Sequence, residues 1–122
     1  MPKVLVVDDE PDITRLVKFT LERKNFEVYT ADNGENALSI ASQERPDLIL
    51  LDVTMPVLDG YETCRRLKSN PETQTIPVVM LSARSQQAEI ETGIEAGAVD
   101  YVKKPFSPKE VIDKVEEILN KA

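Results

Sequence analysis

The residues best suited to chemistry in this chain are carboxylates placed directly after runs of apolar residues. Asp8 and Asp9 follow the run Val4–Val7, and Asp52 follows the run Leu48–Leu51. Apolar runs without alternation are typical of strands buried on both faces, as in a parallel sheet. Because open α/β sheets bind ligands at the carboxyl ends of their strands, these acids are candidates for one shared site.

Two further polar residues stand at the ends of later strands. Ser82 ends the run Val78–Leu81, and Lys104 follows the predicted strand Val99–Val102. In a parallel sheet with the strand order 2-1-3-4-5, the first and third strands are neighbours about 4.8 Å apart. We therefore expect the three acids to meet at the topological switch point, with Ser82 and Lys104 on the other flank of the site.

Three carboxylates this close need compensation for their charge. At about 5 Å and an effective dielectric of about 20, each pair of carboxylates repels by roughly 3 kcal/mol. Either the pKa values of the acids rise or a cation enters. Because the chain has no His and the ligands are oxygens, the expected cofactor is Mg²⁺, with Mn²⁺ as the alternative. A lysine and a hydroxyl opposite such an ion would hold a phosphoryl group, and the central Asp52 is the expected carboxylate nucleophile.

The elements that position these residues alternate between strand and helix. The predicted strands are Lys3–Val7, Phe26–Thr30, Asp47–Leu51, Pro77–Leu81 and Val99–Val102. Repeated right-handed βα units wind into a parallel sheet with helices on both faces. A chain of 122 residues has the length of one domain. We expect one α/β domain over residues 1–122, a flavodoxin-like (βα)5 three-layer sandwich with a parallel five-stranded sheet in the order 2-1-3-4-5.

Apolar stripes and local start signals predict the helices. The two clearest stripes are Ile13, Leu16, Val17 and Leu21, and Val111, Val115, Ile118 and Leu119. Start signals precede three helices, at Asn33-Gly34, at Asp59 with Glu62, and at the capping box Ser107-Pro108-Lys109-Glu110. The fourth helix is the weakest, because only Ile90 and Ile94 form its stripe and Gly93 costs about 1 kcal/mol relative to Ala. It is a candidate moving part, with a poorly packed surface helix as the alternative.

Composition and charge argue against several classes of function. The chain has 41% hydrophobic and 30% charged residues, as in ordinary globular domains, and its net charge of -7 argues against nucleic-acid binding by this chain itself. Its first residues lack the apolar stretch of a signal peptide, and no apolar run approaches the roughly 18 residues of a membrane span. The single Cys64 allows no internal disulfide and indicates a reducing compartment, so we expect a cytoplasmic protein with a half-buried, inert cysteine.

Four segments of the chain resemble the receiver domain of bacterial two-component response regulators, namely VLVVDDEP, LILLDVTMPVLDG, VVMLSAR and DYVKKPFSP. The resemblance covers essentially the whole chain. It implies that Asp52 accepts a phosphoryl group from a phosphohistidine on a sensor histidine kinase or phosphotransfer protein. It also implies that phosphorylation changes the face made by the fourth helix, fifth strand and fifth helix, which controls an output domain or effector protein. A phosphorylation-dependent homodimer belongs to the same expectation.

The resemblance implies which groups bind a metal ion and which side chains set the lifetime of the phosphorylated state. Asp9, Asp52 and the backbone carbonyl of Thr54 would bind Mg²⁺ directly, whereas Asp8 would act mostly through water. The side chains of Thr54 and Arg84 would flank the attacking water and tune the lifetime of the phosphorylated state. Such a domain catalyses only its own phosphorylation and dephosphorylation, so we expect no enzyme for external substrates.

The resemblance also implies a switch. Ser82 would hydrogen-bond the phosphoryl group, and Lys104 would pair with it. Tyr101 would be the switch aromatic, which turns inward as the Ser82 hydroxyl moves toward phosphate. The Lys104–Pro105 peptide bond is expected to be cis, although only about 5–6% of X-Pro bonds are.

The output and two other functions stay open at this point. LSAR and DYVKKPFSPKE resemble receivers that precede winged-helix DNA-binding domains, but Val99 and Gln86-Gln87 replace residues that are acidic in that class. The chain is therefore expected to be a stand-alone receiver or a domain of a larger regulator. A phosphorylation-independent docking module is the main alternative, and a metabolic enzyme is a distant third. Nucleotide-binding loops of the GxxxxGK[ST] and GxGxxG types are absent from the sequence, and the haloacid-dehalogenase phosphatases would need an acid where Thr54 stands.

Overall fold

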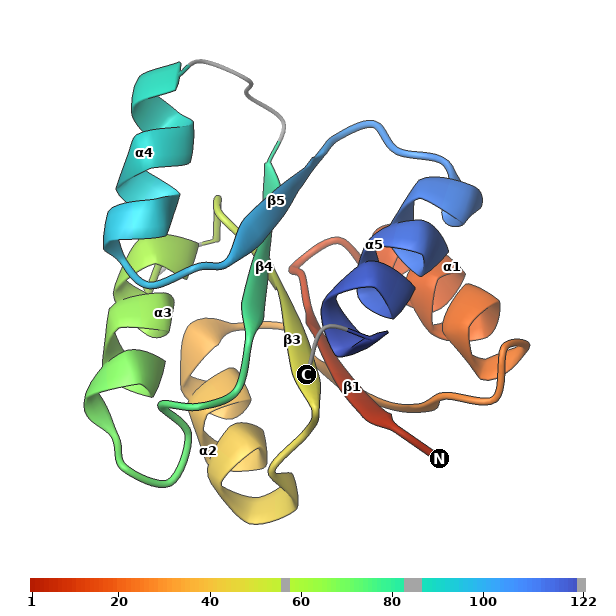
Figure 1. The fold of residues 1–122 in the computed structure, drawn as a ribbon, viewed down its shortest axis with the longest axis horizontal. Coiled ribbons are helices and arrows are strands. Elements are labelled where there is room, and N and C mark those ends of the chain that lie inside the picture. The colour runs from red at the N-terminus through yellow and green to blue at the C-terminus, as the bar shows by residue number, and fades with distance from the viewer. Residues whose placement is uncertain (56–57, 83–86, 121–122) are drawn as a thin grey trace.

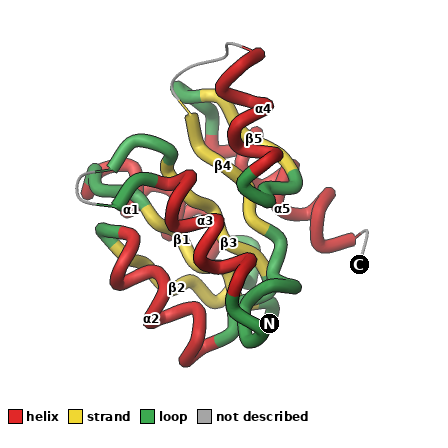
Figure 2. Tube along the Cα trace, turned by 90° about the vertical axis from the view of Figure 1, so that its left-hand side faces the viewer, coloured by secondary structure: helices red, strands yellow, loops and turns green. Residues whose placement is uncertain are grey.

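The computed structural model describes residues 1–55, 58–82 and 87–120, and it has the predicted architecture (Figure 1). The elements are β1 (Lys3–Val7), α1 (Pro11–Glu22), β2 (Glu27–Ala31), α2 (Gly34–Glu44), β3 (Leu48–Asp52), α3 (Gly60–Ser69), β4 (Val78–Ser82), α4 (Gln87–Glu95), β5 (Asp100–Lys103) and α5 (Pro108–Asn120). The strands form one parallel sheet in the order β2-β1-β3-β4-β5, as predicted. α1 and α5 cover one face of the sheet, and α2, α3 and α4 cover the other, which faces the viewer in Figure 2.

The apolar runs are buried because the sheet is covered on both sides. Every residue of β3 and β4 is buried, and so is Val4–Val7 of β1. Side chains alternate between the two faces of a strand. Leu5 and Val7 accordingly pack in the cluster beneath α2 and α3, and Val4 and Val6 pack in the cluster beneath α1 and α5.

The second to fifth strands each begin and end one residue later than predicted, whereas the first strand has the predicted bounds. The ladder continues past the apolar runs, because Asp52 of β3 pairs with Leu81 and Ser82 of β4 pairs with Lys103. Asp52 and Ser82 are therefore the last residues of their strands rather than the first residues of loops. Backbone pairing with a neighbouring strand holds both in place, which hydropathy along the sequence does not reveal.

The predicted helix starts are confirmed where a side chain caps the helix. Asn33 accepts a hydrogen bond from the backbone N–H of Asn36, and Asp59 accepts one from Glu62. At α5, the hydroxyl of Ser107 accepts from the N–H of Glu110, whose carboxylate accepts from the N–H of Ser107. These bonds join residues three positions apart, so the local sequence is enough to specify them.

Two predicted burials are wrong. Leu16 was assigned to the buried stripe of α1 but is exposed, whereas Val17 and Leu21 of the same stripe are buried. Cys64 is fully buried in α3 rather than half-buried, and burial raises the pKa of its thiol to about 11. Within the described ranges, none of the helices combines the length and apolar character that crossing a membrane requires.

Candidate functional site

The acids at the ends of β1 and β3 lie next to each other. β1 and β3 are hydrogen-bonded neighbours, and their pairing brings Val7 opposite Leu51. Asp8 and Asp52 come directly after these two residues, so they lie side by side at the carboxyl edge of the sheet. Asp8 is 1% exposed and Asp52 is 4% exposed, and both are therefore nearly removed from water. The predicted meeting of the first and third strand ends is confirmed.

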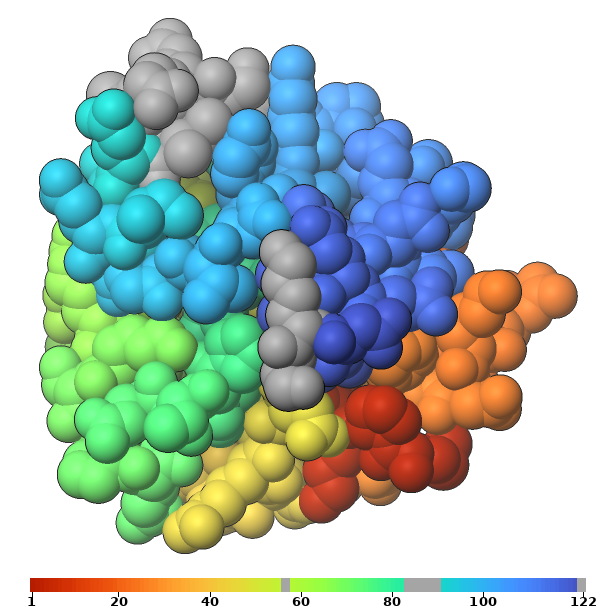
Figure 3. All heavy atoms as spheres, viewed as in Figure 1, coloured from red at the N-terminus to blue at the C-terminus, as the bar shows by residue number. Residues whose placement is uncertain are grey.

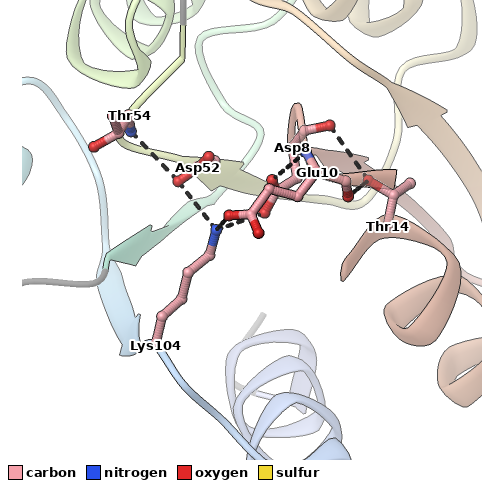
Figure 4. Close-up of polar contacts among 6 residues, drawn as sticks. All are labelled: Asp8, Glu10, Thr14, Asp52, Thr54 and Lys104. Carbon is pink, nitrogen blue, oxygen red and sulfur yellow. Dashed lines mark hydrogen bonds and ion pairs between the residues drawn. The ribbon is translucent and has the colours of Figure 1, made fainter. Parts of the chain in front are cut away.

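The amine of Lys104 lies between these carboxylates (Figure 4). Its Nζ atom is 2.8 Å from Oδ2 of Asp8, 3.4 Å from Oδ1 of Asp52 and 3.5 Å from Oε1 of Glu10. The lysine was expected on the flank opposite the acids, but its long side chain reaches past β4 to the end of β1. A buried pair of like charges requires a cation nearby, and the Lys104 ammonium fills that role in this structure.

Backbone groups fix the two buried carboxylates. The backbone N–H of Glu10 donates to Oδ1 of Asp8 at 2.9 Å, and the N–H of Thr54 donates to Oδ1 of Asp52 at 3.3 Å. The hydroxyl of Thr14 donates to the backbone carbonyls of Asp8 and Glu10, which ties the loop after β1 to the first turn of α1. These bonds fix the carboxylates of Asp8 and Asp52 at the carboxyl ends of β1 and β3.

The charge balance of the site shifts two pKa values. Burial, followed by the negative charge of Asp8, raises the pKa of Asp52 to about 6, even though Lys104 and the N–H of Thr54 act in the opposite direction. Burial alone would lower the pKa of Lys104, but its hydrogen bond to Asp8 and the charges of Asp52 and Asp8 outweigh burial and raise it. Lys104 is therefore a permanent cation at neutral pH, and Asp52 is a carboxylate that gives up its proton less readily than usual.

The exposed acids beside Asp8 make the site suitable for a hard divalent cation. One carboxylate oxygen each from Asp8, Asp9 and Glu10 can lie within 4.8 Å of one another. Carboxylate oxygens are the donors that Mg²⁺ prefers, and the chain contains no His to favour a softer metal. Glu10 was not among the predicted site residues. Its signal was its place directly after the acid pair, but only the fold shows that its carboxylate turns back toward Lys104.

The other predicted site residues surround this centre. Ser82 is buried at the end of β4, and Thr54 is exposed two residues after Asp52. Tyr101 lies on β5 with 37% of its surface exposed, and the Lys104–Pro105 peptide bond is cis, as expected. Arg84 and Gln86 lie outside the described residues.

Comparison with known proteins gives one consistent result. Residues 4–116 match the model of the response regulator receiver domain. The chain is 46% identical to the alkaline phosphatase synthesis transcriptional regulatory protein PhoP of Bacillus subtilis (strain 168), over 98% of this chain and 49% of that protein. It is 44% identical to the phosphate regulon transcriptional regulatory protein PhoB of Rhizobium meliloti (strain 1021), over 100% of this chain and 54% of that protein. The chain thus spans about half the length of these curated relatives.

Solved structures agree with the sequence matches. The chemotaxis protein CheY4 of Vibrio cholerae superposes with a TM-score of 0.93 at 33% identity, covering 97% of this chain and 98% of that one. The receiver domain of the sensor histidine kinase PA1611 of Pseudomonas aeruginosa PAO1, with a magnesium ion coordinated in its active site cleft, superposes with a TM-score of 0.90 at 28% identity over 98% of each chain. The fold, the acidic strand ends and these matches together show that the chain belongs to the response regulator receiver domain family of two-component signal transduction.

Proposed function

We propose that this domain is a phosphorylation-activated switch in which Asp52 accepts a phosphoryl group from a phosphohistidine of a sensor histidine kinase or phosphotransfer protein. The observation that carries the proposal is the position of Asp52, a carboxylate at the end of the central strand with the Lys104 amine 3.4 Å away. A carboxylate oxygen of Asp52 attacks phosphorus, the phosphorus–nitrogen bond of the donor breaks, and its electron pair stays on the imidazole nitrogen.

The electrostatics of the site fit this role. A nucleophilic carboxylate must be ionised, and a pKa of about 6 leaves Asp52 mostly ionised at neutral pH. The incoming phosphoryl group adds negative charge next to Asp8, so the transfer needs cations on more than one side. Lys104 is one of them, and we assign the Ser82 hydroxyl, at the neighbouring strand end, as the donor of a hydrogen bond to the phosphoryl oxygens.

The acids at the strand ends supply the ligands for the second cation. We assign Asp9, Asp52 and the backbone carbonyl of Thr54 as direct ligands of Mg²⁺, with Mn²⁺ as a substitute, and Asp8 as a ligand acting mostly through water. When bound, the ion neutralises charge on the phosphoryl oxygens during transfer. Thr54 and Arg84 would then tune the lifetime of the acyl phosphate. The domain would catalyse only its own phosphorylation and dephosphorylation.

The output is proposed to act through the face of α4, β5 and α5. Figure 3 shows the surfaces of these elements side by side on one face of the molecule. Because Tyr101 of β5 belongs to this face and lines a cavity together with Ser82 of the site, its ring can report the state of Asp52 to a partner. The relatives named above are transcriptional regulators about twice as long as this chain, so we propose that residues 1–122 form the receiver domain of a cytoplasmic regulator whose output domain binds DNA, with a homodimer forming on phosphorylation.

Mass spectrometry after incubation with acetyl phosphate and MgCl₂ tests the proposal. The wild-type chain should gain one phosphate, and EDTA should prevent the gain. Asp52→Asn should gain none, whereas the matched control Asp47→Asn, directly before the first residue of the same strand, should react like the wild type. Acid-labile phosphate on Asp52→Asn would show that the nucleophile is assigned wrongly. A wild-type chain that gains no phosphate would favour the docking module instead.

A further inference from the structure

One glycine of the chain has no explanation in the structure as it stands. The chain has four glycines, and all of them are among the described residues. A side chain at Gly34 would collide with the hydroxyl of Thr63, and one at Gly60 would collide with the backbone carbonyl of Asp52. Gly97 has a φ of +111°, a conformation that other residues rarely adopt. Each of these three glycines is therefore required by the structure.

Gly93 is different, although it lies inside α4, where glycine is unfavourable. Its φ is not in the left-handed region. A Cβ atom there would lie 3.4 Å from Cγ of Met80 and 3.8 Å from Cε1 of Tyr61, which are ordinary contact distances. Alanine would fit and would favour the helix. The described conformation therefore gives no steric reason for glycine at this position.

A small cavity lies next to Gly93. Gly93, Met80 and Tyr61 line a cavity that also reaches Ser82 and Tyr101. The cavity is small, because its volume of about 10 Å³ gives room for about one water molecule. The ring of Tyr101 stands at its edge, partly exposed. The ring can enter only if the lining yields, and an additional carbon atom at position 93 would occupy part of the space that it needs.

We propose that Gly93 is kept free of a side chain so that the ring of Tyr101 can turn into the cavity between α4 and β4 when Asp52 is phosphorylated. Gly93 is thus a positioning residue for the switch, and it acts by providing volume rather than by touching the phosphoryl group. This inference rests on the proposed function. The weakness of α4 noted in the sequence would then be a consequence of the switch, because the glycine that admits the ring also lowers the stability of the helix.

Fluorine NMR of the fluorotyrosine-labelled chain tests the inference. The chain has three tyrosines, so a Tyr101→Phe variant identifies the Tyr101 signal. Acetyl phosphate with MgCl₂ should move this signal in the wild type. In Gly93→Ala, mass spectrometry should show the same phosphate gain, but the ratio of inward to outward Tyr101 should fall by about tenfold, as expected for one extra carbon in a packed interior. Unphosphorylated Gly93→Ala should resist urea better than the wild type.

Glu95→Ala is the matched control, because it removes an exposed side chain from the last turn of α4 and adds nothing to the cavity. Its Tyr101 signal should move on phosphorylation as in the wild type. If the Tyr101 signal of phosphorylated Gly93→Ala moves as it does in the wild type, the inference is wrong. If both variants block the movement, stiffness of α4 rather than volume is the cause, and the inference is again wrong. A wild-type chain that gains no phosphate would overturn the proposed function and this inference with it, and the mass measurement separates that outcome from the others.

Discussion

Replacing Asp52 by asparagine should stabilise the metal-free domain at neutral pH. The ionised carboxylate is buried beside Asp8, and these two causes raise its pKa from 3.8 to about 6. A carboxylate whose pKa is raised by folding binds its proton more tightly in the folded state than in the unfolded state. At a pH below the pKa of the unfolded state, the carboxylate is protonated in both states and costs no stability. The cost grows as the pH rises from the pKa of the unfolded state to the pKa of the folded state. Asparagine has the same shape without the charge, so it removes the cost.

The size of the effect follows from the same shift. Raising the pKa from 3.8 to about 6 corresponds to about 3 kcal/mol once the carboxylate is fully ionised. The gain of Asp52→Asn should approach this limit at about pH 8 and fall to roughly half of it at about pH 5. The amide oxygen can still accept the N–H of Thr54, and Lys104 keeps its hydrogen bond to Asp8. The substitution therefore leaves the local hydrogen bonds largely intact.

Urea unfolding followed by circular dichroism, in EDTA and at the two pH values, measures this difference. Asp47→Asn serves as the control, because it changes an exposed carboxylate directly before the start of β3. Adding MgCl₂ should reverse the ranking, because the ion stabilises the wild type by binding the folded state and the variant lacks a ligand. A variant less stable than the wild type at about pH 8 without metal, or a difference that does not change with pH, would refute the reasoning.

Four further substitutions test other parts of the structure. Asp9→Asn should abolish most of the stabilisation that MgCl₂ gives in urea unfolding, and an unchanged response would remove Asp9 from the ligand set. Lys104→Met should cost about 3 kcal/mol at neutral pH without metal, because it leaves Asp8 without its cation, and MgCl₂ should restore part of the loss. Asp59→Ala should cost about 1 kcal/mol through the lost cap of α3 while acetyl phosphate still modifies the domain. Gly60→Ala should cost roughly 1–3 kcal/mol and slow phosphorylation, because the new methyl group displaces the carbonyl of Asp52; normal stability and rate would contradict the close approach.

The order of the elements and the ends of several helices could be predicted from the sequence, because the forces behind them are local. An apolar run such as Leu48–Leu51 must be buried whatever its neighbours are. A cap such as Asp59 or Ser107 bonds to a backbone group three residues away, so a short segment carries the whole signal. Right-handed βα units leave few ways to arrange such elements, and the strand order follows.

The partners within the site were decided by the tertiary structure. Lys104 and Asp8 are 96 positions apart in the chain, and only the packing of β1, β3, β4 and β5 sets the ammonium between Asp8 and Asp52. The raised pKa of Asp52 also depends on this arrangement, because burial and the distance to another charge are properties of the folded chain.

The details that were predicted wrongly also depend on tertiary packing. The residue types placed Asp52 just outside its strand, but pairing with β4 includes it in the sheet. The stripe of α1 included Leu16, but in the folded chain that residue is exposed while Val17 and Leu21 are buried. The sequence by itself determined which segments form strands and helices and which residues stand near the strand ends, because burial and capping act along the chain. The tertiary structure alone decided which charges meet and where space remains, since both depend on groups that are distant in sequence.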